Sequence, residues 1–257
     1  TTAVFAALGD ACDEVREAAL SVARAAVSGD AAEGRADALA SSLAAAVDAL
    51  ASSPPHAQRR DDLARGGLVA LYLHCASALI PEGDAAREPA LKRALAALGS
   101  LGDEGCFVAA RHLAPLVRGA EAETRLVLAK LRRDAVDGDL RPDLRRAAAA
   151  GAAGLMKGLK DADACVAAAS EIAAIVRAKP NGKDARDGQT RAGALTLYAH
   201  LCVTAGRQFE PHAVYAAGDV MCALGDQSAD ARHAADVATR AVVKALPFTA
   251  MKLLAPA

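Results

Sequence analysis

The chain has 257 residues, with 30 Lys and Arg against 31 Asp and Glu, so its net charge is -1. This balance excludes a protein-wide electrostatic field that would steer the chain to nucleic acid or to an anionic membrane. Apolar residues make up 53% of the sequence, but aromatic residues only 3%, and there is no Trp. Because Ala is the strongest helix former and strand-favouring aromatic residues are scarce, the composition predicts an all-α fold with a core of Ala, Leu and Val.

Taken in chain order, apolar periodicity and turn residues predict a series of amphipathic helices. Pro54 and Pro55 must interrupt the helical pattern, since Pro lacks an amide proton and restricts the residue before it. The segment 179–184 is a second expected loop. The helices are expected over residues 2–8, 13–28, 33–51, 59–80, 86–99, 103–118, 121–136, 142–159, 162–178, 187–206, 211–224, 229–245 and 248–255.

An internal repeat organises these helices. Four helix starts share an Arg followed by small residues and an apolar run, at Arg16, Arg145, Arg191 and Arg232, separated by 129, 46 and 41 residues. Two degenerate repeats are expected between the first and second Arg, starting near residues 61 and 103. Because these arginines recur at one repeat position, we expect them to have a structural role, bonding carbonyls or acidic side chains of adjacent turns.

A period of about 40 to 47 residues is typical of HEAT and armadillo repeats, whose helical hairpins must stack to bury their apolar faces. The prediction is an α-solenoid of about six HEAT-type hairpins, forming one continuous array over residues 1–257. The chain begins at Thr1 rather than Met and ends within an apolar pattern. We therefore expect it to be a piece of a longer solenoid.

No residue pattern indicates catalysis, a metal or a cofactor. His74 and Cys75 are adjacent on a helix and point about 100° apart, and His200 with Cys202 fails the same test for zinc ligands. The chain has no nucleophile elbow, HExxH motif or P-loop. The sequence therefore predicts a protein that is not an enzyme and that has no cofactor.

The cysteines and the hydropathy pattern indicate the compartment. The six cysteines are widely spaced and form no C-x-x-C pair, which favours a reducing compartment. There is no signal-peptide pattern, and no apolar run reaches the roughly 18 to 20 residues that span a bilayer. A cytoplasmic protein with no membrane contact is the prediction.

One surface signal is basic. Lys130, Arg132, Arg133 and Arg141 fall around a single predicted helical hairpin turn, and Arg is suited to bidentate phosphate contact. This basic hairpin is a candidate contact for ribosomal RNA or for another partner. Asp134, among other acidic residues, is interleaved with the cations, so a neutralised solvated surface is the alternative.

The ordered motifs after Arg145 resemble the general control non-derepressible protein 1 family, very large HEAT-repeat activators of the initiation factor 2 kinase. Before Arg145 the similarity is thinner. A related array is the N-terminal HEAT region of fungal elongation factor 3. The segments that carry the resemblance are 146–159, 191–195, 206–214, 225–226, 231–236 and 252–256.

This resemblance implies a non-catalytic scaffold segment that is associated with ribosomes in amino-acid-starvation signalling. It also implies that the full-length parent partners an ABC-type ATPase and supports activation of the initiation factor 2 kinase. The family's kinase-binding segment lies further toward the C-terminus, so no kinase contact is assigned to this chain. The alternative class is a generic HEAT-repeat adaptor for protein–protein interaction, of the transport-receptor or phosphatase-scaffold type.

Overall fold

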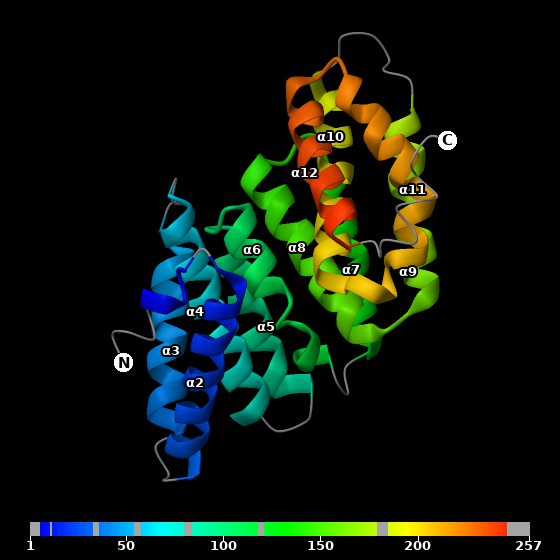
Figure 1. The fold of residues 1–257 in the computed structure, drawn as a ribbon. Helices are drawn as coiled ribbons and strands as arrows, with labels where there is room; N and C mark the ends of the chain where they lie inside the picture. Colours follow the sequence, from blue (N-terminus) through cyan, green and yellow to red (C-terminus); the bar gives the residue numbers. More distant parts are fainter. Residues whose placement is uncertain are drawn as a thin grey trace. The chain divides into compact units, whose positions relative to one another are not determined.

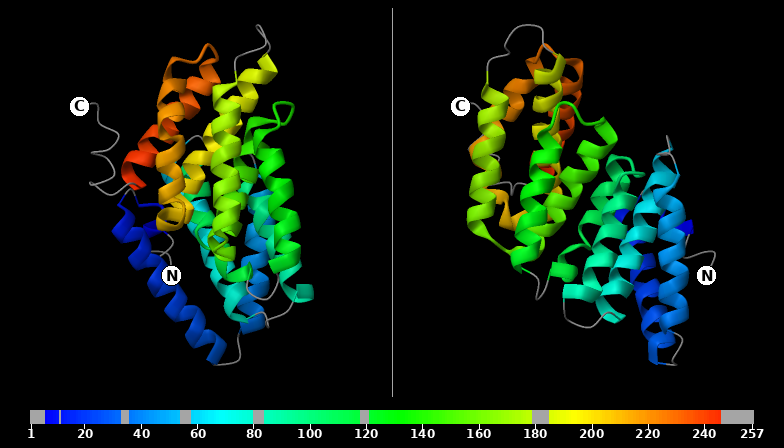
Figure 2. Two further views of the ribbon diagram at one scale, coloured as in Figure 1. Left: turned by 90° about the vertical axis from the view of Figure 1, so that its right-hand side faces the viewer. Right: turned by 180° about the vertical axis from the view of Figure 1, so that it is seen from behind.

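The computed structural model describes residues 6–10, 12–32, 36–53, 58–79, 84–117, 121–178 and 185–245. The chain forms two compact units, Thr1–Thr124 (unit 1) and Arg125–Ala257 (unit 2). Every regular element in these described ranges is helical (Figures 1 and 2), so the all-α prediction is confirmed. The prediction of one continuous array concerns how the two units join, and it stays a prediction.

Unit 1 is a stack of helical hairpins in two layers. Helices α2, α4 and α6 pack side by side in one layer, while α3 and α5 pack in the other, and each hairpin crosses between the layers (Figure 1). The elements are α2 (Asp13–Ala32), α3 (Ala36–Ala51), α4 (Arg59–Leu79), α5 (Asp84–Leu98), α6 (Asp103–Ala110) and a 3₁₀ turn at Ala114–Val117.

Unit 2 has the same two-layer organisation. Helices α8, α10 and α12 form one layer, and α9 packs against α11 in the other. This alternation of layers along the chain is that of the predicted solenoid of hairpins. The elements are α7 (Glu121–Val136, which contains the boundary between the units), α8 (Pro142–Leu159), α9 (Ala162–Arg177), α10 (Ala185–His200), α11 (Glu210–Cys222) and α12 (Ala229–Ala245).

The helix starts lie within three residues of the predicted positions, but two helices end early. The helix expected over 103–118 ends at Ala110, because Pro115 cannot donate a helical hydrogen bond. The helix expected over 187–206 becomes a π-helical turn at Leu201–Ala205 and ends at Gly206, whose φ of 57° favours glycine. The helix predicted over 248–255 lies outside the described residues, as does most of the one over 2–8.

Small residues bring the helices of each unit close together. In α8 every residue from Ala147 to Met156 is buried, which fits a helix surrounded by neighbours. In unit 1 a Cβ built on Gly66 of α4 would lie 2.5 Å from the carbonyl oxygen of Gly105 in α6. In unit 2 a Cβ on Gly193 would overlap the carbonyl oxygen of Ala135. The Ala-rich core therefore depends on close backbone approach as well as on side-chain volume.

Candidate functional site

Three of the four repeat arginines bond the turn that precedes their own helix. Arg16 donates from Nη1 to the carbonyl oxygen of Asp10 at 2.5 Å, and Arg232 donates from Nη1 to that of Asp226 at 2.7 Å. Arg145 donates from Nη1 to the Leu140 carbonyl oxygen at 2.6 Å. These carbonyls lie five or six residues before the arginine, so each guanidinium holds a Gly-Asp-type turn against the start of the next helix.

Arg191 bonds forward instead, to the next repeat. Its Nε and Nη2 donate to the two carboxylate oxygens of Asp226 at 2.6 and 2.9 Å. The side chains are 7% and 11% exposed, so this bidentate pair is nearly dry. The hydrogen bonds from Arg191 lower the pKa of Asp226, and the same bonds raise the pKa of Arg191.

A polar ladder joins three consecutive repeats of unit 2. Arg145 donates from Nη2 to the side-chain oxygen of Gln189, and Gln189 donates from Nε2 to Asp230. The sequence analysis missed Gln189 and Asp230. A signal was present, because the residue two positions before each repeat Arg is an acid or an amide. These residues are Glu14, Asp143, Gln189 and Asp230.

One buried repeat-to-repeat contact of unit 1 is made by a carboxylate. Asp62, on α4, accepts hydrogen bonds from the backbone N–H groups of Gly102 at 2.5 Å and Gly105 at 2.7 Å. Gly102 is the N-cap residue of α6 and Gly105 lies in its first turn, where backbone N–H groups have no partner within the helix. The side chain is buried, at 4% exposure. Asp62 thus caps the helix of the next repeat, in the part of the chain where the repeat Arg is displaced or missing.

The structure places the predicted basic hairpin at the end of α7 and the start of α8, and half of its cations have acidic partners. Arg132 forms an ion pair with Glu171 of α9, and its side chain is 18% exposed. Arg141 lies 3.2 Å from Asp143. Lys130 and Arg133 are exposed and have no acidic partner among the described residues. Glu171 of α9 and Asp143 of α8 therefore neutralise part of the hairpin, and Lys130 and Arg133 are its two available cations.

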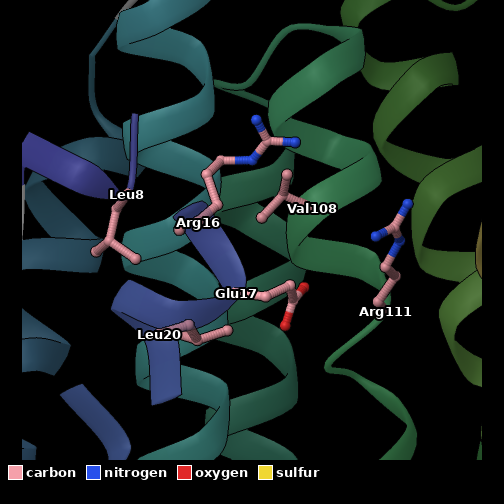
Figure 3. Close-up of a pocket in the computed structure, with 7 residues that line it drawn as sticks. Leu8, Arg16, Glu17, Leu20, Val108 and Arg111 are labelled. Carbon is pink, nitrogen blue, oxygen red and sulfur yellow. The ribbon is translucent and has the colours of Figure 1, made fainter. Parts of the chain in front are cut away.

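A small pocket with both basic and acidic lining residues lies in unit 1, between α2 and α6. A small space of about 20 Å³, here called the α2–α6 groove, is room for about one water molecule. Figure 3 shows Arg16 and Glu17 of α2, with Val108 and Arg111 across from them. The groove is lined by Leu8, Arg16, Glu17, Leu20, Gly67, Val108 and Arg111.

Burial and the charges near this groove shift the pKa of Arg16. Burial lowers the pKa of Arg16, and the positive charges of Arg111 and Arg59 lower it further, against the attraction of Glu104. The buried Nε–H of Arg111 has no hydrogen-bond acceptor in the described part of the chain. Two turns along α2, Arg24 Nη2 lies 3.0 Å from His112 Nδ1. The sequence analysis missed this surface because Arg24, Arg111 and His112 are far from any visible cluster in the sequence.

The corner between α10 and α11 is built from the motif at 206–214. Phe209 is fully buried and meets Tyr198 edge to face, with ring centroids 5.9 Å apart. The Tyr198 hydroxyl donates to the Ala213 carbonyl oxygen at 2.7 Å. The motif therefore has a packing role, fixing the angle between the two helices.

Neither a metal site nor a membrane span was found in the ranges that the structure describes. No three His, Cys, Asp or Glu side chains are grouped there so as to hold a metal ion. Among the same residues, no helix is both long and apolar enough to cross a membrane.

Comparison with known proteins supports the resemblance noted in the sequence. Residues 145–257 match the family model described as "EF3 N-terminal HEAT repeat". The mouse and human proteins named "Stalled ribosome sensor GCN1" are each 28% identical to this chain over 182 residues, which is 69% of this chain. These matches make the chain similar to a HEAT-repeat region of GCN1. The matched region amounts to 6% of the length of each of these relatives.

A solved structure also aligns with most of this chain. It is a designed armadillo repeat protein, aligned over 93% of this chain and 98% of its own, with 13% identity and a TM-score of 0.29. The assignment to HEAT repeats therefore depends on the family model and on the two-layer packing described above, not on this alignment.

Proposed function

We propose that this chain is a non-catalytic scaffold segment of a cytoplasmic, ribosome-associated protein that acts in amino-acid-starvation signalling. The observation that carries the proposal is the similarity to the stalled ribosome sensor GCN1 over 182 residues. Stacked helical hairpins suit a protein that presents extended surfaces to macromolecules. Through its full-length parent, the chain supports activation of the initiation factor 2 kinase and partnership with an ABC-type ATPase.

The basic hairpin is the proposed contact with ribosomal RNA. Lys130 and Arg133 are exposed on α7, and Arg141 is exposed at the start of α8 beside Asp143. Arg132 is held by Glu171, so its contribution is to position α7 against α9. Cations without an internal partner release counterions when they meet phosphates, which makes Lys130 and Arg133 the residues to test.

The test is ribosome co-sedimentation of the full-length parent across a salt series, comparing wild type with the double variant Lys130→Glu and Arg133→Glu. We expect weaker association and a log–log salt slope shallower by about 1 to 2, as two phosphate contacts are lost. Arg240→Glu is the matched control, since Arg240 is an exposed arginine on α12. Absence of the wild-type parent from the ribosome pellet would overturn the proposed function. Equal slopes for wild type and the double variant would overturn only the hairpin contact.

A further inference from the structure

We propose that the hydrogen bond between Arg24 and His112 is a pH-sensitive contact, which holds α2 against the end of α6 and is released when His112 takes up a proton. Arg24 lies on α2, and His112 directly follows Arg111, the C-cap residue of α6. The proposal goes beyond the proposed function, because it concerns how unit 1 responds to acid, whereas the basic hairpin belongs to unit 2.

The geometry of the bond fixes the protonation state of His112. Arg24 Nη2 lies 3.0 Å from His112 Nδ1. A guanidinium group has N–H donors and no acceptor, so Nδ1 accepts the bond and the proton of the neutral ring is on Nε2. A proton added to Nδ1 removes this acceptor and places a positive ring against a positive guanidinium. The bond and the protonated ring therefore exclude each other.

The charges around this contact are mainly positive. The titratable and charged side chains near it, from α2, α4, α5 and the end of α6, are Glu17, Arg24, His74, Arg87 and Arg111. Burial lowers the pKa of His74, and the charge of Arg24 lowers it further. Glu17 is the acid of the group, and it lies two turns before Arg24, where it lines the α2–α6 groove with Arg111 (Figure 3). A further positive charge on His112 is therefore unfavourable.

Helix α2 depends on polar contacts because it contributes few apolar side chains to the core. Among its described side chains, the buried apolar ones are Ala19 and Leu20, while Val15 and Val22 are 40% and 56% exposed. A helix with little buried apolar surface opens locally at a low cost in free energy. The loss of one charge-assisted hydrogen bond should therefore change how often α2 opens.

The direction of the pH response follows from this arrangement. Because Arg24 opposes the proton on His112, the folded chain takes up this proton less readily than the unfolded chain, in which a histidine has a pKa of about 6.5. The contact therefore stabilises the folded position of α2 above about pH 6.5, and this stabilisation is lost as the pH falls below that value.

The experiment measures hydrogen exchange of the α2 backbone amides in the full chain at about pH 7.5 and about pH 5.5, on either side of the histidine pKa. The rates are corrected for the intrinsic pH dependence of exchange and compared with those of α9, a helix of unit 2 that contains no histidine. We expect the protection of α2 relative to α9 to fall about tenfold at the lower pH, the effect of one charge-assisted hydrogen bond. An unchanged protection ratio would overturn the proposal.

Three variants assign the response to one histidine. His112→Gln keeps an oxygen acceptor for Arg24 but takes up no proton, and Arg24→Gln removes the opposing cation, so the ratio should change less than about twofold in both. His74→Gln is the matched control, because it removes the other histidine near Arg24 and should keep the wild-type response. A wild-type response in His112→Gln, or its loss in His74→Gln, would overturn the proposal.

A measurement on the wild type needs no variant to fold. Long-range ¹H–¹⁵N spectra at about pH 7.5 distinguish the two neutral forms of an imidazole ring. The contact requires the proton of the His112 ring to be on Nε2. A proton on Nδ1 would overturn the proposal.

Discussion

The buried polar contacts between repeats differ in the two units. In unit 2 they are made by repeat arginines, as in the Arg191–Asp226 pair and the contact between Arg145 and Gln189. In unit 1 the buried contact between α4 and α6 is made by the carboxylate of Asp62, whereas Arg59 and Arg93 reach Glu104 and Asp48 of other helices at the more exposed surface. Two stacks of the same architecture thus use different side chains for the buried contact between repeats.

Arginine density in a sequence does not by itself locate a binding surface. The basic hairpin is dense in the sequence, yet Arg132 and Arg141 are paired with acids of the same unit. The repeat arginines Arg16, Arg145 and Arg232 bond the turns before their own helices, so their recurrence reflects the fold.

The largest expected effect comes from the pair that joins repeats in unit 2. Arg191→Ala leaves Asp226 without its bidentate partner in a nearly dry site, and it should lower the free energy of unfolding by about 3 kcal/mol. Urea unfolding of the full chain measures this value. Arg240→Ala, which removes an exposed arginine paired with Asp236 on the same helix, should change it by less than about 0.5 kcal/mol.

The pH dependence sharpens this test. The pKa of Asp226 is lowered in the folded chain, so its contribution to stability is present above the unfolded pKa of about 4 and is lost as the pH falls below it. The stability difference between wild type and Arg191→Ala should therefore narrow between about pH 5 and pH 2. A difference that stays constant over this range would show that the carboxylate is not the partner that matters.

The next effect in size concerns close backbone approach. In Gly193→Ala the new Cβ would overlap the Ala135 carbonyl oxygen, so the helices must separate, at a cost of about 2 kcal/mol. Gly218→Ala on α11 is the matched control, because its Cβ would meet nothing within 4 Å. Since Ala is a better helix former, the control should gain about 0.5 to 1 kcal/mol. A change of the melting temperature in the same direction for both variants would contradict this packing.

The smallest of the three stability effects is expected in unit 1. Asp62→Ala removes the acceptor for the N–H groups of Gly102 and Gly105 and should cost about 1.5 kcal/mol. Hydrogen exchange should report faster opening of the amides at the start of α6. Asp163→Ala, an exposed acid in the first turn of α9, should cost less than about 0.5 kcal/mol. If both variants have the same stability, Asp62 is not a cap.

Much of the fold could be predicted from the sequence because each helix starts with its own local signal. The starts of α2, α4, α6, α7, α8, α9 and α12 coincide with the predicted residues. Contacts between repeats were harder to predict, because they depend on which side chains the stacking brings opposite one another. The sequence assigns Arg191 to a repeat position, but it does not show that Asp226 is its partner. No residue pattern near Asp62 indicates that it caps another helix. The candidate surfaces therefore needed the structure to separate paired cations from available ones.

The central claim is that Lys130 and Arg133 are the cations of the basic hairpin available to ribosomal RNA, whereas Arg132 and Arg141 have acidic partners in the same unit. Ribosome co-sedimentation of the full-length parent across a salt series tests it most directly, comparing wild type, the double variant Lys130→Glu with Arg133→Glu, and Arg240→Glu. We predict weaker association and a shallower salt slope for the double variant, and wild-type behaviour for Arg240→Glu. Equal association and equal slopes for all three proteins would contradict the claim.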